Sequence, residues 1–153
     1  MRRQDCFDRM NAVKGNYQLA LRTVNSLIRL AADNARNLRT YDLSLPQMRN
    51  LIVELHEVYF VRMFACFESS VRDYWRTSVR HTKPLTEQLI SLIAARRGIP
   101  QSTLDAVQEI REVRNHLIHE EQDGKKGSIM DEARMNEANK FLNAYLARLP
   151  LQW

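Results

Sequence analysis

The sequence predicts an all-α fold, an up-and-down bundle of about five helices that forms a single domain over residues 1–153. Three observations support this fold class: apolar residues recur at spacings of three and four, capping residues precede the apolar runs, and no useful stretch alternates apolar with polar residues. With 153 residues, 44% of them hydrophobic and 27% charged, the chain is large enough to bury one core.

The first predicted helix covers about residues 8–38. Its apolar stripe consists of Tyr17, Leu21, Val24, Ile28 and Ala31. The polar and proline-containing residues 42–47 interrupt this pattern, so we expect a connection there.

The second predicted helix is long. Ser44 and Gln47 form a capping box, and Pro46 falls in the first turn, where its missing N–H costs nothing. From Met48 to about Thr77 the sequence contains neither glycine nor proline, and residues 58–67 are apolar on nearly every face. Such a helix is either central in its bundle or shared with a second subunit.

The third and fourth helices have clear ends. The third covers Pro84–Arg97, because proline suits a first turn and Gly98 suits a C-terminal cap. The fourth begins at the capping pair Ser102 and Asp105 and reaches about His119. Its apolar stripe consists of Ala106, Ile110, Val113 and Leu117.

A polar segment and a fifth helix complete the pattern. Residues 120–127 contain two glycines and no apolar residue, which predicts a mobile loop. Ser128 and Asp131 repeat the capping pattern and open the fifth helix, which ends at Pro150. The residues expected to face the core are Ala133, Phe141, Leu142, Tyr145 and Leu149.

The charge balance permits a polyanionic partner. The formal net charge is +5 and the sequence pI is about 9.5. Of the 23 basic residues 18 are Arg, the side chain whose planar fork binds phosphate in two places; a solvated basic surface is the alternative. No signal sequence and no apolar run of membrane-spanning length is found, so we expect a cytoplasmic protein without membrane contact.

The absence of their characteristic motifs argues against several kinds of site. The sequence contains no Gly-rich phosphate loop and no Gly-x-Ser-x-Gly elbow, and Cys6 and Cys66 are expected to be apolar fillers. His116 and His119 lie three residues apart but lack a third ligand at recognisable spacing. We therefore expect neither a metal nor another cofactor.

The segment from Arg114 to His119 is the candidate catalytic motif. All four histidines follow an arginine after four to six intervening residues. Arg49 is also followed by an asparagine, Asn50, but that pair begins the apolar second helix. Only the last pair combines a polar Asn115 after the arginine with aliphatic residues before the histidine and a place at the end of the penultimate helix, ahead of a polar loop. With these features the segment resembles the Arg-x4-6-His signature of the HEPN superfamily of metal-independent ribonucleases. Residues 67–75 resemble the aromatic and glutamate segment that many such domains carry opposite the motif.

The resemblance extends over most of the chain in architecture and about four specific residues. It implies a homodimeric endoribonuclease of the toxin or defence-effector type, with Arg114 and His119 as catalytic residues and Asn115 and Glu68 in support. The implied partners are RNA, a second copy and a cognate antitoxin or regulatory protein. In the family, some antitoxins modify a tyrosine two residues past the histidine; Glu121 stands at that position here, so that form of regulation is not expected.

The side chains suit the chemistry of metal-free RNA cleavage. The reaction needs a base for the 2′-OH, a clamp for the phosphorane and an acid for the 5′-oxygen. His119 exchanges a proton near neutral pH, whereas Arg114 stays charged and only donates hydrogen bonds. Their five-residue separation gives about 140° of rotation and about 7.5 Å of rise on a helix, so one copy presents them awkwardly to a single phosphate. Two copies related by a two-fold axis remove this difficulty.

Structural interpretations stand beside these assignments. Arg114 could pair with Glu109, and His119 could simply end a helix, where a cation is favoured. Glu68 could pair with Arg72 one turn later instead of supporting the motif.

Four more basic residues are candidate RNA contacts: Arg111, His116, Lys125 and Lys126. A solvated helix face or loop explains them equally well. The rival functions are a non-catalytic bundle of this type that binds RNA or a nucleotide, and a helical dimerisation module.

Overall fold

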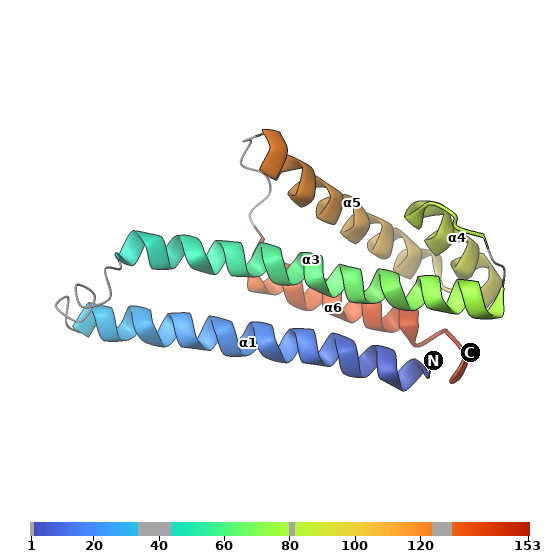
Figure 1. Ribbon diagram of the computed structural model, residues 1–153, viewed down its shortest axis with the longest axis horizontal. Coiled ribbons are helices and arrows are strands. Elements are labelled where there is room, and N and C mark those ends of the chain that lie inside the picture. Colours follow the sequence, from blue (N-terminus) through green and yellow to red (C-terminus); the bar gives the residue numbers. More distant parts are fainter. Residues whose placement is uncertain (1, 34–43, 80–81, 124–129) are drawn as a thin grey trace.

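The chain is an all-α bundle, as predicted from the sequence (Figure 1). The computed structural model describes residues 2–33, 44–79, 82–123 and 130–153, and of residues 120–123 only the backbone. Within these ranges it contains five α-helices and no β-strand. The helices are α1 (Arg3–Asp33), α3 (Leu45–Ser78), α4 (Thr86–Arg97), α5 (Gln101–Asp123) and α6 (Glu132–Leu146).

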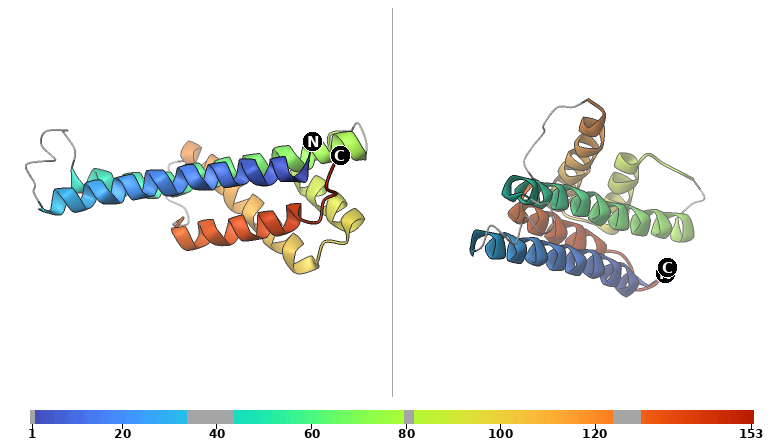
Figure 2. Two further views of the ribbon diagram at one scale, coloured as in Figure 1. Left: turned by 90° about the horizontal axis from the view of Figure 1, so that it is seen from below. Right: turned by 60° about the vertical axis from the view of Figure 1, so that its left-hand side comes forward.

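Helix α3 is the central element, because it contacts each of the other four helices. Figure 2 (left) shows α1 and α3 as one layer with α6 below it, while α5 crosses from the α6 side toward the α3 side. The sequence left two explanations for the apolar section of α3: a central place in the bundle, or a face shared with a second subunit. The central place is confirmed. Part of the helix is also exposed, so a shared face stays possible as well.

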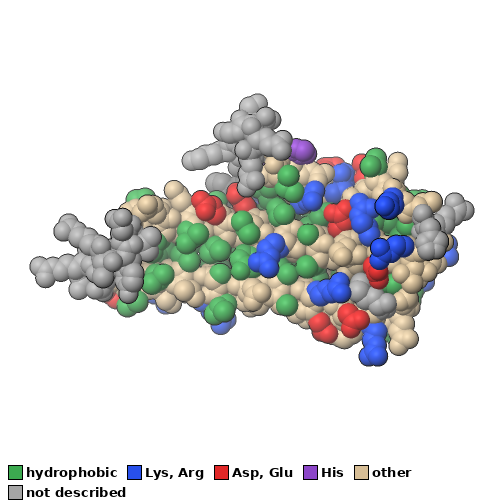
Figure 3. Space-filling model, viewed as in Figure 1, with side chains coloured by type: hydrophobic (Ala, Val, Ile, Leu, Met, Phe, Trp, Pro, Cys, Tyr) green, Lys and Arg blue, Asp and Glu red, His purple; other side chains and the backbone are tan. Residues whose placement is uncertain are grey.

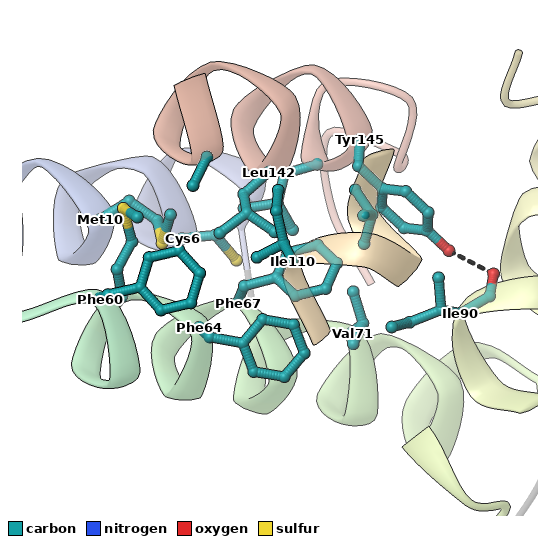
Figure 4. Close-up of a cluster of buried hydrophobic side chains, with 14 of the residues drawn as sticks. Cys6, Met10, Phe60, Phe64, Phe67, Val71, Ile90, Ile110, Leu142 and Tyr145 are labelled. Atoms are coloured by element: carbon teal, nitrogen blue, oxygen red, sulfur yellow. Dashed lines mark hydrogen bonds between the residues drawn. The ribbon is translucent and has the colours of Figure 1, made fainter. Parts of the chain in front are cut away.

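The main core lies between α3, α6 and the neighbouring helices (Figure 4). Phe67 packs edge-on against Tyr145, with ring centroids 5.3 Å apart, and both side chains are fully buried. The Tyr145 hydroxyl donates a hydrogen bond to the backbone oxygen of Ile90, 2.6 Å away. Burial raises the pKa of Tyr145 far above its ordinary value, so the phenol remains a neutral donor that ties α6 to α4.

Beyond this core, α1 and the first half of α3 form a two-helix arm (Figure 1, left end). A second, smaller cluster is buried there, made by Val24, Ala31 and Met48. His56 lies at the base of the arm. Its Nδ1 and the Tyr17 hydroxyl form a hydrogen bond of 2.8 Å. Burial lowers the pKa of His56 and raises that of Tyr17 to about 12, so both are neutral at physiological pH.

The predicted capping box at the start of α3 is confirmed. The Gln47 N–H donates to the Ser44 hydroxyl (3.3 Å), and the Ser44 N–H donates to the Gln47 side-chain oxygen (2.8 Å). The predicted stop of α4 is confirmed as well. Gly98 adopts φ 60°, a left-handed conformation that glycine enters without steric cost, and its N–H caps the Ala94 carbonyl.

The boundaries of α1 differ from the prediction. The helix begins at Arg3 instead of about residue 8, because the stripe continues backwards through the buried Cys6 and Met10. Residues 34–38 of the predicted helix lie outside the described residues. Cys66 is half-buried, and both cysteines are free, in agreement with their expected role as apolar fillers.

The boundaries of α5 differ more. It begins at Gln101 after Pro100, so Ser102 is not its cap, and the Asp105 carboxylate accepts instead from the Gln101 side chain (2.7 Å). The helix continues to Asp123, four residues past the predicted end. Nothing before Gly124 breaks a helix there, since Glu and Gln are good helix formers. Residues 124–127 of the predicted loop lie outside the described residues.

Helix α6 begins one residue after its cap. The cap is Asp131, whose side chain accepts from the Arg134 N–H (2.8 Å); Ser128 lies outside the described residues. Ala133 is exposed, contrary to the prediction, because the buried stripe runs through Met135 and Ala138. Phe141 is half-buried. The helix ends at Leu146, and Leu149 is buried after a turn.

The two ends of the chain lie side by side. The Arg3 guanidinium donates to the backbone oxygens of Ala147 (2.6 Å) and Leu149 (2.9 Å). The Trp153 ring packs edge-on against Tyr74 of α3, with centroids 5.6 Å apart. Among the described helices, none has a stretch apolar enough over the length needed to cross a bilayer.

Candidate functional site

Arg114 lies on the face of α5 that is turned toward α3. Its guanidinium carbon sits 5.9 Å from the centroid of the Phe64 ring, in the range of a cation–π contact. Its Nη1 donates to the Asn115 side-chain oxygen, 3.0 Å away. The guanidinium thus contacts an aromatic ring on one helix and an amide oxygen on its own helix.

The same guanidinium keeps donor capacity. Its Nε is buried and has no hydrogen-bond partner among the described residues. No described acid forms an ion pair with Arg114, and the pairing with Glu109 proposed as an alternative is not observed. A half-buried guanidinium that is oriented but unneutralised can bind an anion that enters from solvent.

Glu68, on α3, takes part in a closed cluster with Arg72 and Thr86. Three hydrogen bonds end on its Oε1: from Arg72 Nε (2.9 Å), Arg72 Nη2 (2.7 Å) and the Thr86 hydroxyl (2.7 Å). Arg72 also donates to the Pro84 backbone oxygen (3.2 Å). The cluster therefore fixes the start of α4 against α3.

The ionised form of Glu68 is favoured. Burial by itself would raise its pKa, but the hydrogen bonds from Thr86 and Arg72, together with the charges of Arg72 and Arg114, outweigh burial and lower the pKa. Of the two roles considered for Glu68, the ion pair with Arg72 is present. The charge of Glu68 also acts on Arg114, but the two side chains form no direct ion pair.

His119 lies near the C-terminal end of α5, and its side chain is exposed. It forms no hydrogen bond with a described residue. Arg114 and His119 lie five positions apart on the continuous helix α5, so their side chains point in different directions. One chain therefore does not present both side chains to the same point. His116 is exposed on the same helix.

The other basic candidates separate into two groups. Arg111 is engaged between helices: its Nε donates to the Gln108 side-chain oxygen (2.8 Å), and its Nη2 lies 3.5 Å from a Glu87 carboxylate oxygen on α4. Only 14% of its side chain is exposed, so its charge mainly joins α4 and α5. Lys125 and Lys126 lie outside the described residues.

On the face of the molecule seen in Figure 3, basic and acidic side chains are interspersed over the C-terminal half of α3 and beside α4. A shallow groove is lined by Arg9, Arg72 and Arg76, together with Ala65, Glu68, Ser69 and Asp73. Arg76 pairs with Asp73 at 2.8 Å. The groove joins the Glu68 cluster to the surface.

Two residues of the site had no signal in the sequence. Phe64 is one of several apolar residues in the central part of α3, and nothing in the pattern distinguishes it as the platform for Arg114. Thr86 lies 18 positions from Glu68, and their contact depends on the angle between α3 and α4. Only the packing of helices brings these residues to the site.

Comparison with protein-family models, curated proteins and solved structures finds no match for this chain.

Proposed function

We propose that two copies of this chain form a metal-independent endoribonuclease of the HEPN type, a toxin or defence effector, in which Arg114 and His119 of both copies surround one phosphodiester. The observation that carries the proposal is the state of Arg114. It contacts Phe64 and Asn115, it retains a buried Nε without a hydrogen-bond partner among the described residues, and it forms no ion pair with a described acid. A structural arginine at a helix contact would have its donors satisfied, as Arg72 has.

In the proposed reaction the ribose 2′-oxygen attacks phosphorus and the bond from phosphorus to the 5′-oxygen breaks. One imidazole removes the 2′-OH proton, and the second protonates the departing 5′-oxygen, so that the products are a 2′,3′-cyclic phosphate and a 5′-hydroxyl. The guanidinium of Arg114 donates hydrogen bonds to the phosphorane oxygens, where negative charge develops. A dimer supplies two imidazoles, which is the number that this proton balance needs.

The first test is cleavage of a single-stranded RNA by purified protein in EDTA. We expect 2′,3′-cyclic phosphate ends from the native chain and loss of at least about 100-fold in rate for Arg114→Ala and for His119→Ala. Arg49→Ala is the matched control, because Arg49 also precedes an asparagine but lies exposed on the arm. Cleavage that survives both changes at the motif contradicts the proposal.

The second test separates cleavage from binding. If RNA binds in a salt-dependent manner and remains intact after long incubation, the chain is a binding module and the catalytic assignment is wrong. If the native chain neither binds nor cuts RNA, the motif has no role toward RNA.

A further inference from the structure

Between Leu51 and Ala65, the line of α3 that points directly away from the core is apolar. Leu51, Val58 and Ala65 follow one another at seven-residue spacing and are exposed, Leu51 by 41% and Val58 by 52%. We call these three residues the outer stripe. The opposite side of the helix, with Phe60 and Phe67, is buried in the core. A surface helix normally presents polar residues on the side opposite its core.

The residues three and four positions from Val58 extend this face. Leu55 and Val61 are half-buried, and Glu54 and Arg62 are exposed. Neither Glu54 nor Arg62 forms an ion pair with a described residue, and Arg62 lies over the ring of Tyr59 (5.2 Å). Figure 3, which looks onto α3, shows hydrophobic side chains along its N-terminal half.

We propose that the outer stripe is the contact to a second copy of this chain, with the two α3 helices antiparallel about a two-fold axis that passes beside Val58. In this arrangement each residue faces the one equally far on the other side of Val58 in the partner copy. Val58 then faces Val58, and Leu51 faces Ala65. These pairs bury the apolar line that one chain leaves open to water.

The same register pairs the flanking residues by type. Leu55 of one copy faces Val61 of the other, since both lie three positions from Val58. Glu54 faces Arg62, since both lie four positions away, and symmetry produces this ion pair twice. Contact with a second copy thus accounts for the placement of a carboxylate, Glu54, and a guanidinium, Arg62, at equal distances on the two sides of Val58. Such charge complementarity sets the register and orientation of helix pairs.

The arrangement also places both candidate motifs on one side of the dimer. The two-fold axis is perpendicular to the plane of the paired α3 helices, so an element on one side of that plane meets its symmetry mate on the same side. Helix α5 lies on such a side and crosses α3 obliquely in the opposite direction, so beyond Arg114, which lies beside Phe64, the chain leads back toward the N-terminal half of α3 (Figure 1). Its C-terminal end returns to the level of the α1 and α3 layer (Figure 2, left). The functional consequence of this convergence rests on the proposed ribonuclease activity; the interface itself does not.

Charge reversal tests the register. Sedimentation equilibrium without RNA should show a dimer for the native chain, and Glu54→Arg or Arg62→Glu should each raise the dissociation constant by at least about tenfold, because each places like charges together. The double variant with both changes should return to within about threefold of the native value. A native monomer at high micromolar concentration, or a double variant no better than the single ones, overturns the proposal. Circular dichroism confirms that each exposed variant is folded.

Cross-linking tests the position of the axis. In a Cys66→Ser background, Val58→Cys should form an intermolecular disulfide under copper–phenanthroline oxidation, because a residue beside the axis meets its own symmetry mate. Val53→Cys is the matched control, because Val53 is 40% exposed but lies off the outer stripe. Equal cross-linking at both positions overturns the proposed axis.

The two proposals fail in different ways. Dimerisation through the outer stripe without RNA cleavage refutes the ribonuclease and leaves the interface intact. Full cleavage by a monomeric Glu54→Arg variant refutes the interface as the source of a composite site.

Discussion

Arg72 and Arg114 approach the same glutamate from different helices, and the protein uses them differently. Arg72 donates to Glu68, to Thr86 and to the Pro84 carbonyl, so its charge and donors are satisfied inside the fold. Arg114 contacts Phe64 and Asn115 and forms no ion pair with a described acid, although the charge of Glu68 acts on it from beyond contact distance. A guanidinium in the first state holds helices together, whereas one in the second state is available to a ligand.

Substitution of lysine for each arginine in turn should distinguish Arg114 from Arg72 most strongly in the cleavage assay. We expect Arg114→Lys to lower the rate of RNA cleavage by at least about 100-fold, because an ammonium lacks the planar fork that grips two phosphate oxygens. The melting temperature should change little. A variant that cuts RNA at the native rate would show that Arg114 acts only as a positive charge or not at all.

The next largest effect should come from Glu68. We expect Glu68→Gln to lower the free energy of unfolding by about 1–3 kcal/mol, because Arg72 and Thr86 lose a charged acceptor that is largely buried. Urea denaturation measures this change. Glu87→Gln is the control: Glu87 also pairs with an arginine, but 66% of its side chain is exposed, so the change should stay below about 0.5 kcal/mol.

The Glu68 effect should depend on pH with a defined sign. Because its pKa is lowered in the folded state, the carboxylate stabilises the fold above its unfolded pKa and loses this contribution as pH falls through the folded pKa. The stability difference between native chain and Glu68→Gln should therefore shrink on the acid side of the ordinary value of 4.5. A difference that stays constant down to that range would mean that the carboxylate is not the stabilising group.

Arg72→Lys should have a smaller effect, and on stability alone. We expect a loss of about 1 kcal/mol, because a lysine cannot reach Glu68, Thr86 and the Pro84 carbonyl together. RNA cleavage by the folded protein should remain within about threefold of the native rate. A large loss of cleavage without unfolding would show that Arg72 takes part in binding RNA and is not only a structural residue.

The smallest effect should come from the aromatic platform. Phe64→Leu removes the ring beneath Arg114 but keeps an apolar side chain, so we expect a three- to tenfold loss in cleavage, on the order of 1 kcal/mol. Arg72→Lys and Phe64→Leu combined should have additive effects on cleavage, since the two sites share no contact. Strong non-additivity would indicate that Glu68 couples them.

The helices were largely predictable, whereas the contacts of the candidate site were not. The capping box at Ser44 and the stop at Gly98 follow from local chemistry, and both are present as predicted. The continuation of α5 to Asp123 was missed, because a polar segment without a helix breaker is compatible with either helix or loop. The sequence left two roles open for Glu68, support of the Arg114–His119 motif or an ion pair with Arg72, which lies one helical turn later.

By itself, the sequence determined the all-α class, the course of most helices and the segment in which chemistry was to be sought. These properties depend on periodicity, caps and residue type, which are local. Only the tertiary structure decided which arginine is satisfied and which is left with a free donor, and that the outward line of α3 is apolar. Such properties depend on the angles at which helices cross, and these angles are set by packing over the whole core.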